Sequence, residues 1–199
     1  TAAIAYTGAT PVFADILEDT WTVDPTDCVR KLSPKTRAVI PVDLFGLCAD
    51  IPALRQALAK AGRNDVFILE DAAEAYGSSL RGIRAGALGD AGIFSFYGNK
   101  TITAGEGGMV LTSRPDLAER VRFLKNHAMS ATKRYFHPEV GFNYRMTNLQ
   151  AAVGLAQLAG ADELLARKRR IHARYRAALE GQKGIRLQAV PQGHAFLPW

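Results

Sequence analysis

Short apolar segments of strand length alternate along this chain with segments of helical periodicity, and this alternation restricts the fold more than any other feature. Frequent β-branched and aromatic residues predict strands at residues 11–15, 38–42, 66–70, 92–96 and 109–112. Helical spacing predicts helices over 51–61 and 116–127, and over a longer stretch, 148–179, that could break at Gly160. This order of elements predicts an α/β domain with a largely parallel sheet.

Composition agrees with one main domain of ordinary globular type. The chain has 199 residues, of which 48% are hydrophobic, enough for one sizeable core. The net charge of +6 does not indicate nucleic-acid binding, because basic residues are scattered except in the run 167–170, and a site for anionic phosphates explains mild basicity equally well. Cys28 and Cys48 show neither metal-ligand spacing nor a disulfide pattern, which favours a reducing compartment.

The ends of the chain and its histidines suggest no membrane or metal role. No charged leader or apolar run of membrane-spanning length is present, so we expect a soluble cytoplasmic protein. Residues 1–8 look like the end of a helix that stops at Gly8, which predicts that the chain begins inside an element and is a fragment. The histidines, at 127, 137, 172 and 194, show no pairing typical of a metal site.

Polar residues at strand ends carry the candidate chemistry. Asp71 directly follows the predicted strand 66–70, and ligands of open α/β sheets bind beyond the carboxyl ends of strands. Ser95 lies near the end of another predicted strand, and Lys100 follows Gly98-Asn99, a dipeptide typical of a tight turn. Pyridoxal 5′-phosphate (PLP) needs such a set: a lysine for a Schiff base, a carboxylate facing its pyridine nitrogen and a hydroxyl near its phosphate.

Each residue also has a plainer interpretation. Glu70 and Asp71 could simply cap a following helix, Ser95 could be structural, and Lys100 could be solvated in a loop. Glu74, three residues after Asp71, could reach the hydroxyl of the cofactor ring if a helix or turn begins there. The glycine-rich segment 105–108 favours a tight turn over a nucleotide P-loop, since it leads into a strand and lacks the following lysine and hydroxyl.

Four ordered motifs, taken together, resemble the DegT/DnrJ/EryC1/StrS family of PLP-dependent sugar aminotransferases. The resemblance begins at residues 8–13 and covers nearly the whole chain; its motifs are Glu70-Asp71-Ala72-Ala73-Glu74-Ala75, Phe94-Ser95-Phe96-Tyr97-Gly98-Asn99-Lys100, Gly105-Glu106-Gly107-Gly108 and Gly141-Phe142-Asn143-Tyr144-Arg145-Met146. It implies the three-layer α/β/α large domain of fold type I, similar to aspartate aminotransferase. Residues 1–181 would form that domain without its N-terminal segment. Residues 182–199 would begin the connection to a small C-terminal domain that is largely absent.

The resemblance also implies roles for individual residues. Lys100 would bind the cofactor covalently and carry protons, Asp71 would pair with the pyridinium nitrogen, and Glu74 would lie on the side of the ring hydroxyl. Ser95 would bind the phosphate, and Asn143 would reach the phosphate held mainly by the other subunit of a homodimer. The implied substrates are glutamate and a nucleotide-linked 4-keto-6-deoxy sugar, and the most similar members aminate C4 of a GDP-linked sugar.

Two departures from the family pattern bear on these expectations. Asp43 stands where many relatives have a histidine, which affects any contact made by that histidine. The phosphate loop would precede Thr1 and most of the small domain would follow Trp199, so a molecule that truly ended at these residues should bind PLP poorly.

Three alternative functions stay open at this point. One is a PLP-dependent 4-keto-6-deoxysugar 3-dehydratase, a class that shares this fold. Its members resemble a site with histidine at the position of Lys100, so Lys100 argues against this alternative. Another is an aminotransferase of the same family for a different nucleotide sugar or a cyclitol. The third is a non-catalytic scaffold or sensor, which the joint presence of Lys100, Asp71 and Ser95 disfavours.

Overall fold

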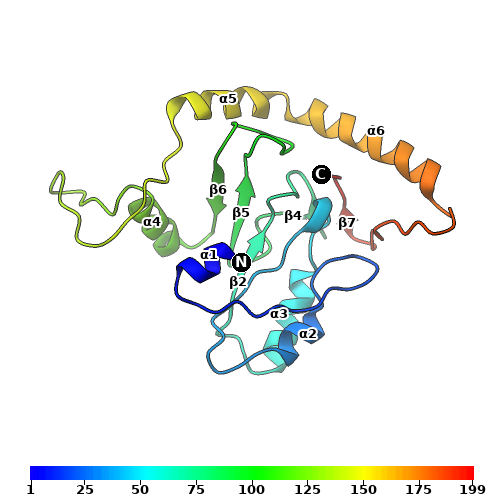
Figure 1. The fold of residues 1–199 in the computed structure, drawn as a ribbon, viewed down its shortest axis with the longest axis horizontal. Helices are drawn as coiled ribbons and strands as arrows, with labels where there is room; N and C mark the ends of the chain where they lie inside the picture. Colours follow the sequence, from blue (N-terminus) through cyan, green and yellow to red (C-terminus); the bar gives the residue numbers. More distant parts are fainter.

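A four-stranded sheet forms the centre of the computed structural model, which describes residues 1–199 (Figure 1). The strand order is β1-β2-β5-β6; the first three strands run parallel and β6 is antiparallel to β5. The bounds are Ala38–Val39 for β1, Phe67–Asp71 for β2, Ala91–Ser95 for β5 and Gly108–Leu111 for β6. The mostly parallel sheet predicted from the sequence is therefore confirmed.

The helices begin and end at the residue types that the sequence offers for caps. The Asp50 side chain accepts a hydrogen bond from Ala53 N (2.9 Å) at the start of α3, and Thr147 and Gln150 form a capping box at the start of α5. Gly160 separates α5 from α6, as predicted. The helices are α1 (Ala2–Tyr6), α2 (Pro25–Arg30), the 3₁₀ helix η1 (Leu44–Gly46), α3 (Ile51–Lys60), α4 (Pro115–Leu124), α5 (Asn148–Ala159) and α6 (Ala161–Leu179). None of them is long and apolar enough to cross a membrane.

The main core lies between the sheet and the pair α2 and α3, which lie together on one side of the molecule (Figure 1). Its buried members come from both helices, from β2 and from the residues just before α3 and β2: Cys28, Ala49, Ile51, Leu54, Leu58, Val66 and Ile68. By contrast, α5 and α6 lie end to end along the opposite margin, and α5 has no buried residue. The core therefore fixes β2 firmly and leaves α5 exposed.

A second, antiparallel sheet was not predicted. It consists of β3 (Ser79–Leu80), β4 (Ile83–Arg84) and β7 (His194–Ala195), in the order β4-β3-β7. Ser78, next to β3, donates to Gly46 O (2.6 Å) and accepts from Leu197 N (3.0 Å). These contacts bring the last residues of the chain against η1.

The strand predicted over 11–15 is wrong. This segment makes no ladder, and the nearest pairing is a single antiparallel bridge between Ile16 and Val23. The Asp15 N–H donates instead to the buried Asp27 carboxylate (2.7 Å), so a side chain takes the place of a neighbouring strand.

The strand predicted over 38–42 is shorter than expected. It ends at Val39, and after it Val42 makes one isolated parallel bridge to Asp71. Pro41 lies between them and has no N–H to donate, which interrupts the ladder. The bridge nevertheless places this segment beside the end of β2.

Substituting Gly46 by alanine should destabilise the protein by about 3 kcal/mol. Gly46 has φ +97°, and an added Cβ would overlap the Leu197 carbonyl oxygen. Gly62 is a matched control, because it has φ +71° with open space around it, so Gly62→Ala should cost only about 1 kcal/mol. Urea unfolding measures both; equal losses would show that residues 197–199 do not pack on Gly46.

Candidate active site

Asp71 and Ser95 lie on one face of the sheet at its carboxyl edge. Asp71 is the last residue of β2, and Ser95 is the last residue of the neighbouring parallel strand β5. Asp71 pairs with Ile93, and Ser95 follows two residues later, so alternation directs both side chains to the same face. This is the edge at which ligands of open α/β sheets bind.

No helix begins after Asp71, so the helix-cap interpretation of the acidic cluster is wrong. Residues 72–78 form turns, and Asp71 Oδ1 accepts from Ala73 N (3.1 Å). Asp71 Oδ2 has no hydrogen-bond partner in this chain, and Asp71 is half-buried, so this oxygen can accept a hydrogen bond from a ligand. The turns carry Glu74 away from the sheet and towards Lys100.

Lys100 meets Glu74 in a largely buried position. The turn that begins at Tyr97 closes through a hydrogen bond from Lys100 N to Tyr97 O (3.0 Å). The Lys100 side chain is 14% exposed and that of Glu74 is 19% exposed, and Lys100 Nζ lies 3.7 Å from Glu74 Oε1. Such screening from water distinguishes Lys100 from an ordinary loop lysine.

An aromatic cluster, made of Trp21, Phe45 and Trp199, lies next to this ion pair. The Phe45 ring stacks on that of Trp199 at 6.5 Å and meets the Trp21 ring edge-on at 6.0 Å. The Trp199 ring centroid lies 4.6 Å from Lys100 Nζ, and its buried indole N–H has no hydrogen-bond partner. Sequence reasoning missed this cluster, because nothing local links residues 21, 45 and 199.

Phe45 connects the aromatic cluster to Glu74. Its backbone N–H donates to Glu74 Oε2 (2.9 Å), and its carbonyl accepts from Trp199 N (3.2 Å). Phe45 has φ +55°, in the left-handed region that non-glycine residues rarely adopt. The unusual conformation thus serves to direct an N–H group at the carboxylate that faces Lys100.

Glu70 has a structural role on the other face of the sheet. Its fully buried carboxylate accepts hydrogen bonds from Gly86 N (2.7 Å), Leu88 N (2.7 Å) and Gly89 N (3.2 Å). It therefore fixes the 86–89 loop just before β5 and does not face the candidate cofactor edge.

Asn143 lies apart from the other four candidates. It is exposed and makes an isolated antiparallel bridge to Asn126, on the loop between α4 and α5. Its neighbours Phe142 and Tyr144 have stacked rings 5.0 Å apart. No hydrogen bond or ion pair joins Asn143 to Lys100, Asp71 or Ser95 within this chain.

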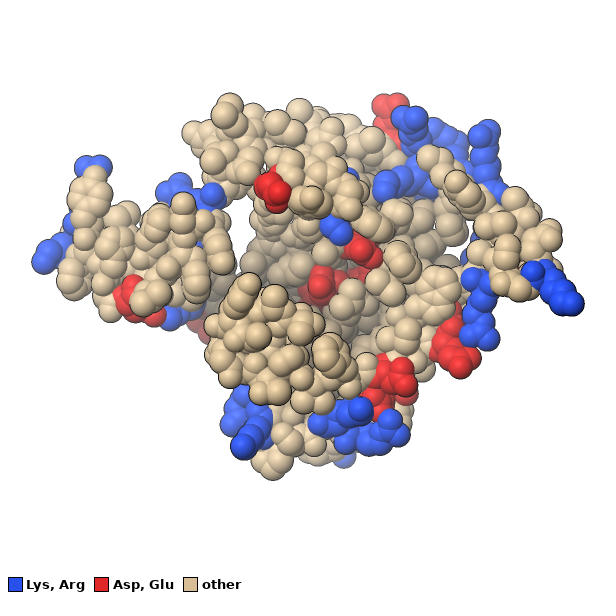
Figure 2. Space-filling view, in the orientation of Figure 1, with Lys and Arg blue, Asp and Glu red and all other residues tan.

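The side chains at this edge fit PLP chemically. Lys100 offers an amine, Asp71 an unengaged carboxylate oxygen, and Ser95 a hydroxyl whose oxygen accepts from Tyr97 N (3.3 Å) and whose hydrogen is free to donate. Figure 2 shows a hollow near the middle of this view, where acidic side chains lie beside a basic one, whereas most Lys and Arg side chains lie at the margins.

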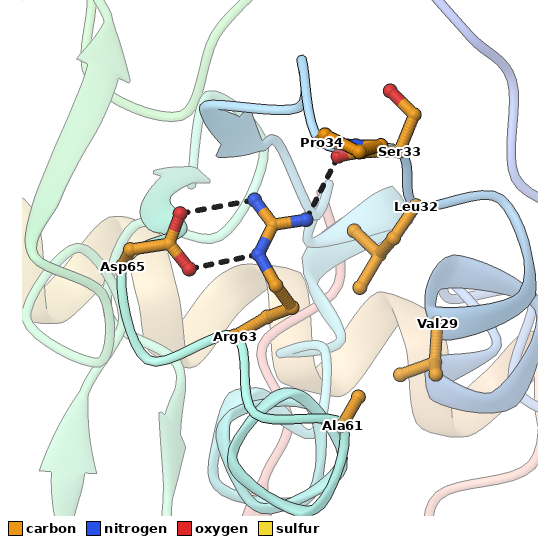
Figure 3. A pocket seen from close by; sticks show the side chains of 7 residues that line it. All are labelled: Val29, Leu32, Ser33, Pro34, Ala61, Arg63 and Asp65. Atoms are coloured by element: carbon orange, nitrogen blue, oxygen red, sulfur yellow. Dashed lines mark hydrogen bonds and ion pairs between the residues drawn. The ribbon is translucent and has the colours of Figure 1, made fainter.

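A groove near α2 and α3 does not offer comparable chemistry (Figure 3). Its one basic group, Arg63, is bound bidentately by Asp65 and donates to the carbonyl oxygens of Ser33 and Thr36. The groove lies at the start of β2, opposite the end that carries Asp71. Arg63 therefore stabilises the fold at this place.

Comparison with known proteins supports the expected relationship. Residues 1–197 match the sequence model of the DegT/DnrJ/EryC1/StrS aminotransferase family. The chain is 46% identical to GDP-perosamine synthase of Caulobacter vibrioides, over 88% of this chain and 47% of the relative, and 44% identical to GDP-perosamine synthase of Escherichia coli O157:H7, over 98% and 52%. The crystal structure of S. venezuelae DesV superposes with a TM-score of 0.89 at 40% identity, covering 98% of this chain and 52% of DesV. The chain thus spans about half the length of the curated relatives it matches.

Two substitutions of Glu74 should distinguish the effect of its hydrogen bond with Phe45 from the effect of its negative charge. Glu74→Ala removes the acceptor, so hydrogen exchange of the Phe45 amide should quicken about tenfold. Glu74→Gln keeps an oxygen acceptor and should retain most of the protection. NMR-detected exchange measures both variants; unchanged exchange in Glu74→Ala would show that this bond does not hold the Phe45 turn.

Proposed function

Because this chain belongs to the DegT/DnrJ/EryC1/StrS aminotransferase family, we propose that it carries the cofactor-binding centre of a cytoplasmic, PLP-dependent sugar-nucleotide aminotransferase. The observation that carries the proposal is the screened Lys100, 3.7 Å from Glu74, at the sheet edge shared by Asp71 and Ser95. The proposed reaction moves an amino group from glutamate to a nucleotide-linked 4-keto-6-deoxy sugar. Its likeness to two GDP-perosamine synthases supports a GDP-linked sugar and amination at C4.

The residues of the edge would divide the work as follows. Lys100 would hold PLP covalently, Asp71 would face its pyridine nitrogen, and Ser95 would donate to its phosphate. Bound PLP supplies an electron sink for the carbon that loses or gains the amine. The Asp71 carboxylate favours the protonated ring nitrogen on which that sink depends.

Lys100 would transfer the proton in both halves of the reaction. Glutamate would first pass its amino group to the bound cofactor and leave as 2-oxoglutarate, with water supplying the keto oxygen, and the keto sugar would then receive that group from the cofactor with release of water. In each half the freed Lys100 Nζ would take a proton from one carbon and return it to another. Glu74 and the Trp199 ring, both close to Nζ, would keep this amine in place between the two transfers.

The presence of a lysine at position 100 disfavours the dehydratase alternative. The low exposure of this lysine disfavours the scaffold alternative. A lysine without a catalytic role rarely loses most of its exposure beside a carboxylate and an aromatic ring. The aminotransferase proposal therefore accounts for more of this site than either alternative.

We extend the proposal to a homodimer in which Asn143 serves the neighbouring subunit's site. Asn143 reaches none of the site residues of its own chain, and the adjoining helix α5 exposes apolar side chains on its surface, namely Leu149, Val153, Leu155 and Leu158. Exposed apolar area of this kind is typical of an interface. Residues 1–181 would form the large domain of each subunit, and residues 182–199, whose strand β7 pairs with β3 of this domain, would begin the connection to a small domain.

Lys100→Ala should abolish covalent PLP binding without unfolding the protein. The intact protein should show a visible absorption band with PLP that glutamate removes, and the variant should show neither the band nor the response. Lys60→Ala, at an exposed position in α3, is the control and should behave like the wild type. A band that persists in Lys100→Ala would refute the role of this lysine.

Charged substitutions on α5 should weaken self-association. Leu149 is 82% exposed and Leu155 is 69% exposed, so Leu149→Lys with Leu155→Lys should leave the fold intact and weaken the dimer at least about tenfold. Sedimentation of the intact protein measures the dissociation constant, and circular dichroism checks the fold. A monomeric wild type, or a double variant that associates as strongly as the wild type, would contradict the proposed dimer.

A further inference from the structure

Asp43 presents a buried oxygen that has no donor. The residue is fully buried, and its Oδ1 accepts from Ala49 N (2.8 Å). Its Oδ2 is also buried and has no hydrogen-bond partner. An ionised carboxylate in this position would be costly, because a buried charge requires pairing or hydrogen bonds.

The Glu70 carboxylate is the group that Asp43 faces. The parallel bridge between Val42 and Asp71 places Asp43 on the same face of the sheet as Glu70. Three backbone N–H groups already donate to Glu70, and they stabilise its negative charge. Burial, and then the charge of Glu70, raise the pKa of Asp43 well above its usual value. Both effects favour the protonated form of the Asp43 carboxyl.

Neither Asp43 nor Glu70 forms an ion pair with a basic side chain, since their hydrogen-bond partners are backbone N–H groups. The titratable groups around Asp43 are Glu70, Asp71 and Cys48, and both other carboxylates oppose its ionisation. Burial and the adjacent Asp43 and Glu70 raise the pKa of the Cys48 thiol, which keeps it neutral. His194 reaches this region only through its contact with Cys48 O (3.1 Å).

We propose that Asp43 stays protonated, donates through Oδ2 to Glu70, and by this shared proton positions the turn that holds Glu74 opposite Lys100. Asp43 is thus a positioning residue. Its N–H donates to Asp71 O (3.0 Å) and its carbonyl accepts from Gly46 N (3.3 Å), so it anchors both ends of the turn. Between them lies Phe45, whose N–H binds Glu74.

Loss of the proton would place two negative charges in one buried space. The carboxyl groups would separate, and the backbone of Asp43 would move with its side chain. Because Phe45 lies two residues later, its N–H would lose alignment with Glu74. The inference rests on the proposed function only for its bearing on catalysis, since the shared proton and the turn exist without a cofactor.

Asp43→Asn in the intact protein tests the shared proton. The carboxamide keeps an acceptor for Ala49 N and directs an N–H group at Glu70 at every pH. In the wild type, the raised pKa of Asp43 means that the folded state binds more protons than the unfolded state between about pH 3.8 and the folded pKa. The free energy of unfolding therefore falls as the pH rises through this window. Across this pH window, the ratio of the folding equilibrium constant of Asp43→Asn to that of the wild type should rise by up to about tenfold per pH unit.

Glu163→Gln serves as the matched control, because Glu163 is exposed on α6 and should leave the pH dependence of the wild type unchanged. Infrared spectroscopy supplies a second measurement that does not depend on the stability of any variant. The wild type should show a protonated-carboxyl band at neutral pH that Asp43→Asn lacks. Absence of the band from the wild type, its persistence in Asp43→Asn, or parallel stability curves would overturn the shared proton.

The positioning role has its own readout. As the pH rises through the folded pKa of Asp43, protection of the Phe45 amide against exchange should fall in the wild type and not in Asp43→Asn. Equal protection in the two proteins across this range would overturn the positioning role. Neither measurement uses PLP, so failure here is distinguishable from a failure of Lys100 to bind the cofactor.

Discussion

The buried carboxylate of Glu70 is the group on which the geometry of the sheet edge depends. It joins β2 to the loop that leads into β5, through three hydrogen bonds from backbone N–H groups. The same carboxylate faces Asp43, from which the chain turns towards Glu74. One charged group on the hidden face of the sheet therefore sets the positions of residues on the opposite face, where the cofactor would bind.

The sequence predicted the parts of this fold that depend on local pattern. The strands that end at Asp71 and near Ser95 could be predicted because their apolar residues are contiguous, and α3 and α5 because their apolar residues recur at helical spacing. The small sheet of β3, β4 and β7 was missed because its strands have two residues each and β7 comes from the far end of the chain. Pairing of this kind leaves no periodic signal.

The candidate site, like the fold, has parts that could be predicted from the sequence and parts that could not. Asp71, Ser95 and Lys100 follow strand ends and turns that can be identified in the sequence, and the register of β2 and β5 brings the first two to one face. The roles of Phe45 and Trp199 come from tertiary packing, since Trp199 approaches Lys100 only because the last residues cross over Gly46. Asp43 was noticed as a departure from the family pattern, but its burial against Glu70 could not be inferred from its neighbours in the sequence.

The left-handed conformation of Phe45 has a consequence for engineering this protein. A bulky residue held at φ +55° stores about 1 kcal/mol or more of strain that glycine would avoid. The ring contacts of Phe45 with Trp199 and Trp21 offset strain of this size, since each aromatic pair contributes about 1 kcal/mol. Replacing Phe45 by glycine would remove the strain and both ring contacts together, so any programme that raises the thermal stability of this protein should keep position 45 unchanged and seek its gains elsewhere.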